Sequence, residues 1–227
     1  MTGELGFLGE LALLIERGGP LMIPIGLCST LGLAIVIERL IYHAWTHEDR
    51  ARTYEHVAEL ARSGRIDAAV EFCRTQRGAL ARTIGAGLTQ FGKESRRVEE
   101  ILTVAGQEQL ARLDLRLRAL EVMATVSPLL GLLGTVTGMI QAFRQVSAVQ
   151  GVVSPSLLAS GIWEALLTTA AGLTVAIPLM MFLHYFERRR EKIGLEIEKY
   201  ASLFVHLHED LASAAQRKLN SARQALR

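Results

Sequence analysis

The sequence has little cysteine and, over a long stretch, no proline. Cys28 lies in an apolar run and Cys73 in a charged segment, and neither belongs to a metal-binding motif. We therefore expect no intrachain disulfide and no bound metal, and interpret both as packing residues. Proline is absent from position 25 to position 127, which permits long uninterrupted helices there.

The chain also lacks the patterns of common catalytic and nucleic-acid-binding sites. The glycines of Gly131-LLG follow no predicted strand, so they predict no phosphate-binding loop. Serine, histidine and carboxylate residues form no cluster that suggests hydrolysis. His43 and His47 are four residues apart, next to aromatic residues at the end of a long apolar run. Aromatic residues in this position are typical of a membrane–water interface, which is a simpler interpretation than a metal site. Acids and bases are interleaved and the net charge is +2, which predicts solvated helix faces. We expect no enzymatic activity, no cofactor and no nucleic-acid partner.

The chain does contain long apolar segments. Half of its 227 residues are hydrophobic, and three windows reach the ~20 apolar residues that a bilayer crossing needs. They are residues 20–42, 119–144 and 157–186. The sequence therefore predicts an all-α membrane protein with three transmembrane helices that contacts membrane lipid.

Basic residues flank these spans unequally. Residues 43–118 contain thirteen Lys or Arg and residues 187–227 contain nine, whereas residues 1–19 contain one and the loop 145–156, which follows Arg144, contains none. Because basic residues gather on the cytoplasmic side, we expect segments 43–118 and 187–227 in the cytoplasm, with the C-terminus. The loop 145–156 and the N-terminus are then expected in the periplasm.

The first segment carries no basic n-region and no small-residue cleavage site, so we expect no cleaved signal peptide. Its apolar residues recur at helical spacing, which predicts an amphipathic interfacial helix over residues 1–19.

The cytoplasmic segments read as helix throughout. Glycines predict breaks between three short helices, at Arg52–Arg62, Ile66–Arg74 and Ala79–Phe91. From Ser95 the apolar period continues without a strong break into the second span, and from the third span it continues into the C-terminal tail. We therefore expect the second and third transmembrane helices to extend far into the cytoplasm.

Small residues line one face of each of these two spans. Such faces indicate contact with another helix or with a polar path, because a lipid-facing surface has no need of them. We predict a small-residue helix-packing face made of Pro128, Gly131, Gly134, Gly138, Gly161, Gly172 and Pro178.

Thr135 and Thr169 lie on these faces, with Thr168 at the edge. Spacing leaves two interpretations open: each hydroxyl bonds a carbonyl of its own helix and only packs, or it lines a polar lumen. Glu164 is the one carboxylate within the apolar part of the third span, either an interfacial residue or a polar group at a pathway mouth or subunit contact.

Neither span has a titratable residue at mid-depth. A proton relay through the membrane normally needs one. If the protein carries protons, the titrating group must therefore come from another chain.

Pro128-LLGLLGTVTGMIQAF followed by Gly161-IWEALLTTAAGLTVAIP resembles the ExbB/TolQ/MotA proton-channel family, and within it ExbB and TolQ. The resemblance implies a homo-oligomer, a pentamer, in the inner membrane of a diderm bacterium. The ring would surround the single transmembrane helices of an ExbD- or TolR-like partner, usually two copies, whose Asp titrates in the lumen. Proton flow would then act on a TonB- or TolA-like protein.

By motif position, Thr135 and Thr169 look like the family's lumen threonines and Glu164 like its third-span glutamate. Thr168 stands where the family usually has alanine and could share the polar role. Three spans argue against the flagellar MotA branch, and the leucine-rich Gly131-LLGTV favours ExbB over TolQ. A passive membrane scaffold, whose small faces only pack helices, is the alternative from another functional class.

Overall fold

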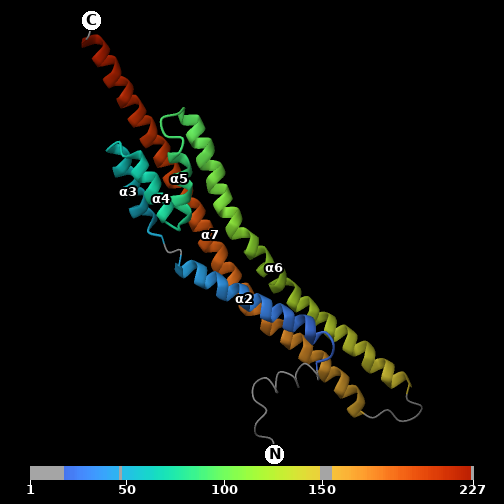
Figure 1. Ribbon diagram of the computed structural model, residues 1–227. Coiled ribbons are helices and arrows are strands. Elements are labelled where there is room, and N and C mark those ends of the chain that lie inside the picture. Colours follow the sequence, from blue (N-terminus) through green and yellow to red (C-terminus); the bar gives the residue numbers. More distant parts are fainter. Residues whose placement is uncertain (1–17, 46–47, 149–154, 226–227) are drawn as a thin grey trace, which may run out of the picture. The chain divides into compact units, whose positions relative to one another are not determined.

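The computed structural model describes residues 18–45, 48–148 and 155–225 and is helical in nearly all of them (Figure 1). The helices are α2 (Met22–Trp45), α3 (Arg50–Arg62), α4 (Ile66–Thr75), α5 (Ala79–Leu88), α6 (Ser95–Ala148) and α7 (Pro155–Ala225). These described ranges contain no strand. The all-α prediction is confirmed, while the amphipathic helix expected in the first segment lies almost wholly outside the described residues. Gly18 to Pro20, at its end, form a turn instead.

Three helices are long and apolar enough to cross a membrane: α2, α6 and α7. Helix α6 has 54 residues and α7 has 71, far more than the ~20 residues of one crossing. Both run without interruption through the predicted ends of their spans, so the prediction that each span continues as one helix beyond the membrane-crossing length is confirmed. Pro128 and Pro178 lie inside α6 and α7 without ending them.

The short helices begin and end at recognisable signals. Asp49 caps α3 by accepting a hydrogen bond from the backbone N–H of Arg52 at 3.2 Å. Gly64, at φ +75°, follows the end of α3. Helix α5 ends at Leu88, three residues before the predicted end at Phe91, because turns occupy the residues up to Gly92 at φ +86°.

The chain divides into two compact units, and the first comprises residues 1–39 and 116–186. Its core joins α2, α6 and α7 through Val36, Leu117, Leu120, Ala124, Leu179, Leu183 and Phe186. Large apolar side chains on the opposite surfaces are exposed, among them Leu129, Leu132, Leu166, Ile177 and Met181. An outward apolar surface over a sparse core is what a lipid-embedded unit requires.

The second unit comprises residues 40–115 and 187–227. Its core gathers side chains of α3, α4, α5 and the parts of α6 and α7 in this unit, including Val57, Leu80, Ile84, Leu102, Ile197 and Phe204. Cys73 belongs to this core, and burial raises the pKa of its thiol to about 12, so it is a packing residue rather than a reactive one. Ion pairs link Arg190 to Asp114 at 2.8 Å and Arg50 to Glu196.

Glu48 fastens the start of α5 within this second unit. Its carboxylate accepts hydrogen bonds from the backbone N–H groups of Leu80 at 3.2 Å and Ala81 at 3.0 Å. An added Cβ at Gly78 would overlap this carboxylate, so a larger residue there would displace the carboxylate from these two bonds. Burial is the main cause that raises the pKa of Glu48 above its ordinary value, and the two backbone bonds oppose it.

A raised folded-state pKa sets the sign of a pH effect at Glu48. The folded state binds the proton more tightly than the unfolded state, so this group's contribution to stability is present at low pH and lost as pH rises through the folded pKa. We expect Glu48→Gln, which keeps an oxygen acceptor without the charge, to gain in Tm relative to the parent as pH rises from acidic to neutral. Thermal unfolding of the detergent-purified protein at several pH values measures this. A Tm difference that stays constant with pH would contradict it, and Glu55→Gln, on the exposed face of α3, is the matched control.

Candidate functional site: the contact between α6 and α7

Helices α6 and α7 approach each other closely along their small residues in the first unit. A Cβ built on Gly134 would lie 2.4 Å from Thr168 Cγ2, and one on Gly138 would lie 2.9 Å from the Cβ of Ala165. Real Cβ atoms essentially never come this close, so any larger residue would force the two helices apart.

The same contact continues in both directions along the pair. Toward the start of the second predicted span, a Cβ on Gly172 would lie 2.6 Å from the carbonyl oxygen of Ser127. Toward the other end, a Cβ on Gly161 would lie 2.6 Å from the Cβ of Ala142. The predicted small-residue glycines therefore all lie in one helix–helix contact within the subunit. Pro128 is half-buried at its edge and Pro178 is exposed.

Thr169 joins the two helices by a hydrogen bond. Its hydroxyl donates to the carbonyl oxygen of Gly131, 38 positions away, at 2.7 Å. The carbonyl of a helix interior is normally shielded by its own turn, and the missing side chain at Gly131 is what lets α7 approach it. The hydrogen bond fixes the Thr169 side chain at the contact between α6 and α7. Because Thr169 is half-buried, part of its surface stays accessible.

Thr135 is placed differently. Its hydroxyl donates to the carbonyl oxygen of Leu132, one turn back in the same helix, at 2.7 Å. The side chain is half-buried. Of these two threonines, only Thr169 bonds from one helix to the other. Their role in a lumen stays a prediction.

Thr168 lies at the centre of the contact between α6 and α7. Its position on a helical wheel had predicted the edge. Only 1% of its surface is exposed. Its hydroxyl lies 2.8 Å from the carbonyl oxygen of Gly18 and 2.9 Å from that of Glu164. The close approach of α6 at Gly134 buries it, and helical spacing within one helix carries no information about that neighbour.

Glu164 is half-buried and lines a cleft of about 190 Å³. The cleft is bounded by the turn at Gly18–Pro20, by α6 and by α7. Thr137 and Gln141 of α6 also line it. Sequence reasoning missed these two residues and the turn, although the Gly18-Gly19-Pro20 triplet just ahead of the first span was an available signal.

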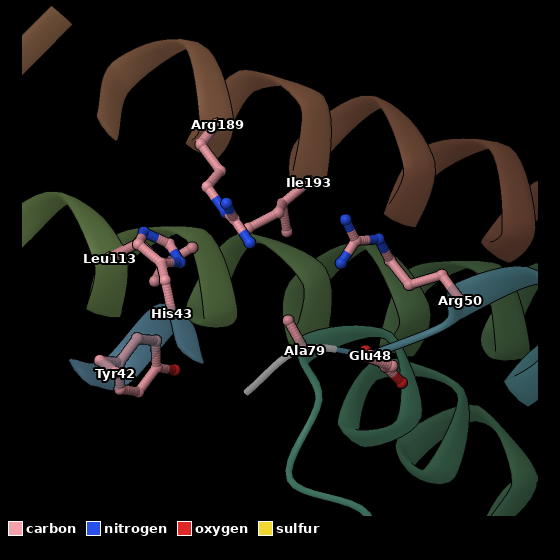
Figure 2. A pocket seen from close by; sticks show the side chains of 8 residues that line it. All are labelled: Tyr42, His43, Glu48, Arg50, Ala79, Leu113, Arg189 and Ile193. Carbon is pink, nitrogen blue, oxygen red and sulfur yellow. The ribbon is translucent and has the colours of Figure 1, made fainter. Parts of the chain in front are cut away.

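A second polar region lies in the second unit, around the end of α2 (Figure 2). A cavity of about 60 Å³ is lined by Tyr42, His43, Glu48, Arg50, Ala79, Leu113, Arg189 and Ile193. Its charged groups are engaged, Glu48 with α5 and Arg50 with Glu196, and His43 and Arg189 also have partners. The arrangement therefore serves the local packing of α2, α5 and α7.

In the parts of the chain that the structure describes, no group of three or more His, Cys, Asp or Glu side chains lies together as metal ligands. His47 is outside those parts. His206 is exposed, near Glu209, whereas His208 is buried with its Nε2 at 2.9 Å from the carbonyl oxygen of Lys93.

Comparison with known proteins identifies the family of this chain. Residues 75–199, more than half of the chain, match the model of the MotA/TolQ/ExbB proton channel family. The chain belongs to this family. The match covers α5, the whole of α6, the predicted third span in α7 and the part of α7 that follows it up to residue 199.

Individual relatives extend the comparison. The biopolymer transport protein ExbB1 of Vibrio cholerae is 34% identical over 166 residues, 68% of this chain and 69% of its own length. The ExbB-like protein 3 of Synechocystis is 31% identical over 170 residues, 74% of this chain and 81% of its own. The Tol-Pal system protein TolQ of Pseudomonas aeruginosa is 35% identical, but over 96 residues, 42% of this chain and 41% of its own. The longer ExbB matches support an ExbB-type energising subunit, and the family is one of proton channels rather than of enzymes.

Proposed function

We propose that the chain is the ring-forming subunit of an inner-membrane motor that uses proton-motive force to energise a TonB-dependent, ExbB-type transport system. Two observations together support this proposal. Helices α6 and α7 are in close contact, and Thr169 of α7 donates a hydrogen bond to the Gly131 carbonyl oxygen of α6. The second and third spans, however, have no titratable group at mid-depth. The chain then supplies the walls and hydroxyls of a pathway, and a partner supplies the carboxylate.

The partner in this proposal is an ExbD-like protein whose single span enters a pentamer of this chain. Family membership supports the class of partner, and the missing mid-depth carboxylate is the physical reason for one. The ring lies in the inner membrane of a diderm bacterium, with the N-terminus in the periplasm and the C-terminus in the cytoplasm. A TolQ-type subunit of an envelope-maintenance motor is the second candidate, which the TolQ matches support over a smaller part of the chain.

Thr135 and Thr169 are the hydroxyls that we assign to the pathway, where they hold water between the periplasmic side and the partner's Asp. Glu164 stands at its mouth. Helix carbonyls already accept bonds from both threonines, so each hydroxyl oxygen keeps its acceptor capacity for water.

We expect Thr135→Val and Thr169→Val to leave the protein level and the assembled ring unchanged while energy-dependent uptake falls to the level of a strain without the protein. Valine keeps the shape and removes the hydroxyl. The measurement is uptake of a TonB-dependent substrate in cells, with ring size by native mass measurement. Thr30→Val is the matched control, because its hydroxyl bonds only carbonyls of its own helix, at 3.1 Å. Normal uptake in both variants would favour the passive scaffold.

A further inference from the structure

The cavity at the end of α2 contributes to local packing, but its lining also has the composition of an anion-binding site. Three basic side chains line this space of about 60 Å³: His43 from the last turn of α2, Arg50 from the start of α3, and Arg189 from α7. Tyr42 adds a phenol hydroxyl to the lining. Figure 2 shows Arg189 extending from α7 toward the His43 ring of α2. Basic groups from three helices therefore converge on one small cavity.

Glu48 is the one carboxylate among the described residues that line the cavity, and its charge is already compensated. Both of its oxygens accept hydrogen bonds from backbone N–H groups at the start of α5, those of Leu80 and Ala81. A helix N-terminus carries a partial positive charge that offsets a carboxylate. Burial also raises the pKa of Glu48, so this carboxyl binds a proton more readily than usual. Glu48 therefore leaves the cavity suited to an anion.

One protein partner does not exhaust the donors of an arginine. Arg50 contacts Glu196 through Nε, and Arg189 is half-buried with a partner of its own. A guanidinium has five N–H donors in a planar fork, and a phosphate group takes two of them in a bidentate pair. A phosphate in the cavity can therefore share both guanidinium groups with their present partners.

The cavity lies where a membrane-crossing helix ends. Helix α2 is long and apolar enough to span a bilayer, and Tyr42 and His43 stand near its last residue, Trp45, which is 73% exposed. Arg189 follows the predicted end of the third span, at residue 186, by three positions. Tyrosine and tryptophan gather at the depth of lipid headgroups, and basic pockets on the cytoplasmic side recognise acidic headgroups. At this depth the abundant anion is the phosphate of a phospholipid.

The size of the cavity limits what enters it. A volume of about 60 Å³ holds about four water molecules, which is the space of one phosphate group and not that of a nucleotide. Leu113 and Ile193 complete the lining, and apolar walls strengthen the attraction between a phosphate and the arginines. The glycerol and acyl chains of the lipid remain outside the cavity, in the bilayer.

We propose that this cavity binds the phosphate of an anionic phospholipid of the cytoplasmic leaflet, with Arg189 as the main ligand and His43, Arg50 and Tyr42 as further donors. The bound headgroup joins the last turn of α2 to α7 and so stabilises the second unit. The inference goes beyond the proposed function. It needs the predicted membrane orientation, but neither a partner nor proton flow.

Native mass measurement of the detergent-purified protein, titrated with phosphatidylglycerol, tests the site. We expect Arg189→Gln to weaken binding about tenfold, the loss expected when a charge-assisted hydrogen bond is removed. Arg188→Gln is the matched control, because Arg188 is the preceding residue of α7, is exposed and does not line the cavity. It should bind lipid like the parent. Equal weakening in both variants would show general attraction to basic residues and overturn the proposal.

Thermal unfolding separates a lipid from free phosphate. Phosphatidylglycerol should raise the Tm of the parent and of Arg188→Gln, but not that of Arg189→Gln, since a ligand that binds only the folded state stabilises it. Phosphatidylcholine, whose choline cation the arginines repel, should raise it less. An equal rise with phosphatidylcholine, or the full rise with inorganic phosphate alone, would contradict a site for an anionic lipid.

Two further variants keep the test decisive if Arg189→Gln does not fold. Tyr42→Phe and His43→Gln each remove one donor from the lining while keeping most of the side-chain volume. We expect both to bind phosphatidylglycerol more weakly than Arg188→Gln, and parent-like binding in both would overturn the proposal. These measurements use the purified protein without a partner, so their outcome is independent of uptake in Thr135→Val and Thr169→Val.

Discussion

Replacing Gly172 with leucine is expected to abolish accumulation of the folded protein in the membrane. A Cβ at Gly172 would lie 2.6 Å from the Ser127 carbonyl oxygen and 3.1 Å from Gly131 Cα. Both are backbone atoms of α6, which cannot turn aside as a side chain does. The whole α6–α7 contact would have to open, at a cost above the ~1–3 kcal/mol typical of overpacking. The bond from Thr169 to the Gly131 carbonyl would be lost with it.

The measurement is the steady-state membrane level together with thermal unfolding of any purified protein. Gly26→Leu is the matched control: the same substitution in another membrane span, where nothing lies within 4 Å of the added Cβ. If Gly172→Leu accumulates and unfolds like Gly26→Leu, the helices do not pack as described.

The chain purified alone and reconstituted in liposomes is expected to pass almost no protons. Between Val122 and Phe143 and between Ala165 and Leu183 the spans contain no Asp, Glu, Lys, Arg or His. Thr168 and Thr169 at the α6–α7 contact both bond carbonyl oxygens, and an alcohol gives up no proton near neutral pH. Without a carboxylate from a partner, the proposed pathway lacks the group on which protons would hop.

A pH-sensitive dye trapped inside the liposomes, with a potassium gradient and valinomycin to set the potential, measures this flux. An added protonophore shows that the vesicles are intact, and co-reconstitution with the proposed ExbD-like partner should raise the flux well above the background of empty liposomes. Substantial flux through the chain alone would contradict the partner argument, because the chain would then contain its own relay.

Much of the fold follows from local patterns, and those predictions were confirmed. The apolar runs gave three membrane-crossing helices, and the unbroken period from Ser95 gave a single α6. The end of α5 was misplaced by three residues. The turn that ends it before Gly92 depends on αL geometry, which the apolar period does not register.

The surroundings of Thr168 could not be predicted from helical periodicity. A helical wheel places it beside Thr169 on α7 and says nothing about what lies opposite. In the structure Gly134 leaves the space that buries it, and Gly18 supplies the carbonyl that it bonds. These partners are 34 and 150 positions away, and no period along one helix relates them.

The sequence by itself determined that the protein is an all-α membrane protein with small-residue spans, and its motifs identified the family. Both follow from composition and short spacing, which act within one helix. Only the tertiary structure decided which small residues meet, that Thr169 bonds from α7 to α6, and that the turn at Gly19 lies against Glu164. The bond from Thr169 arises because glycines at the contact let two helices approach closely enough for a hydroxyl of one to reach a carbonyl oxygen of the other.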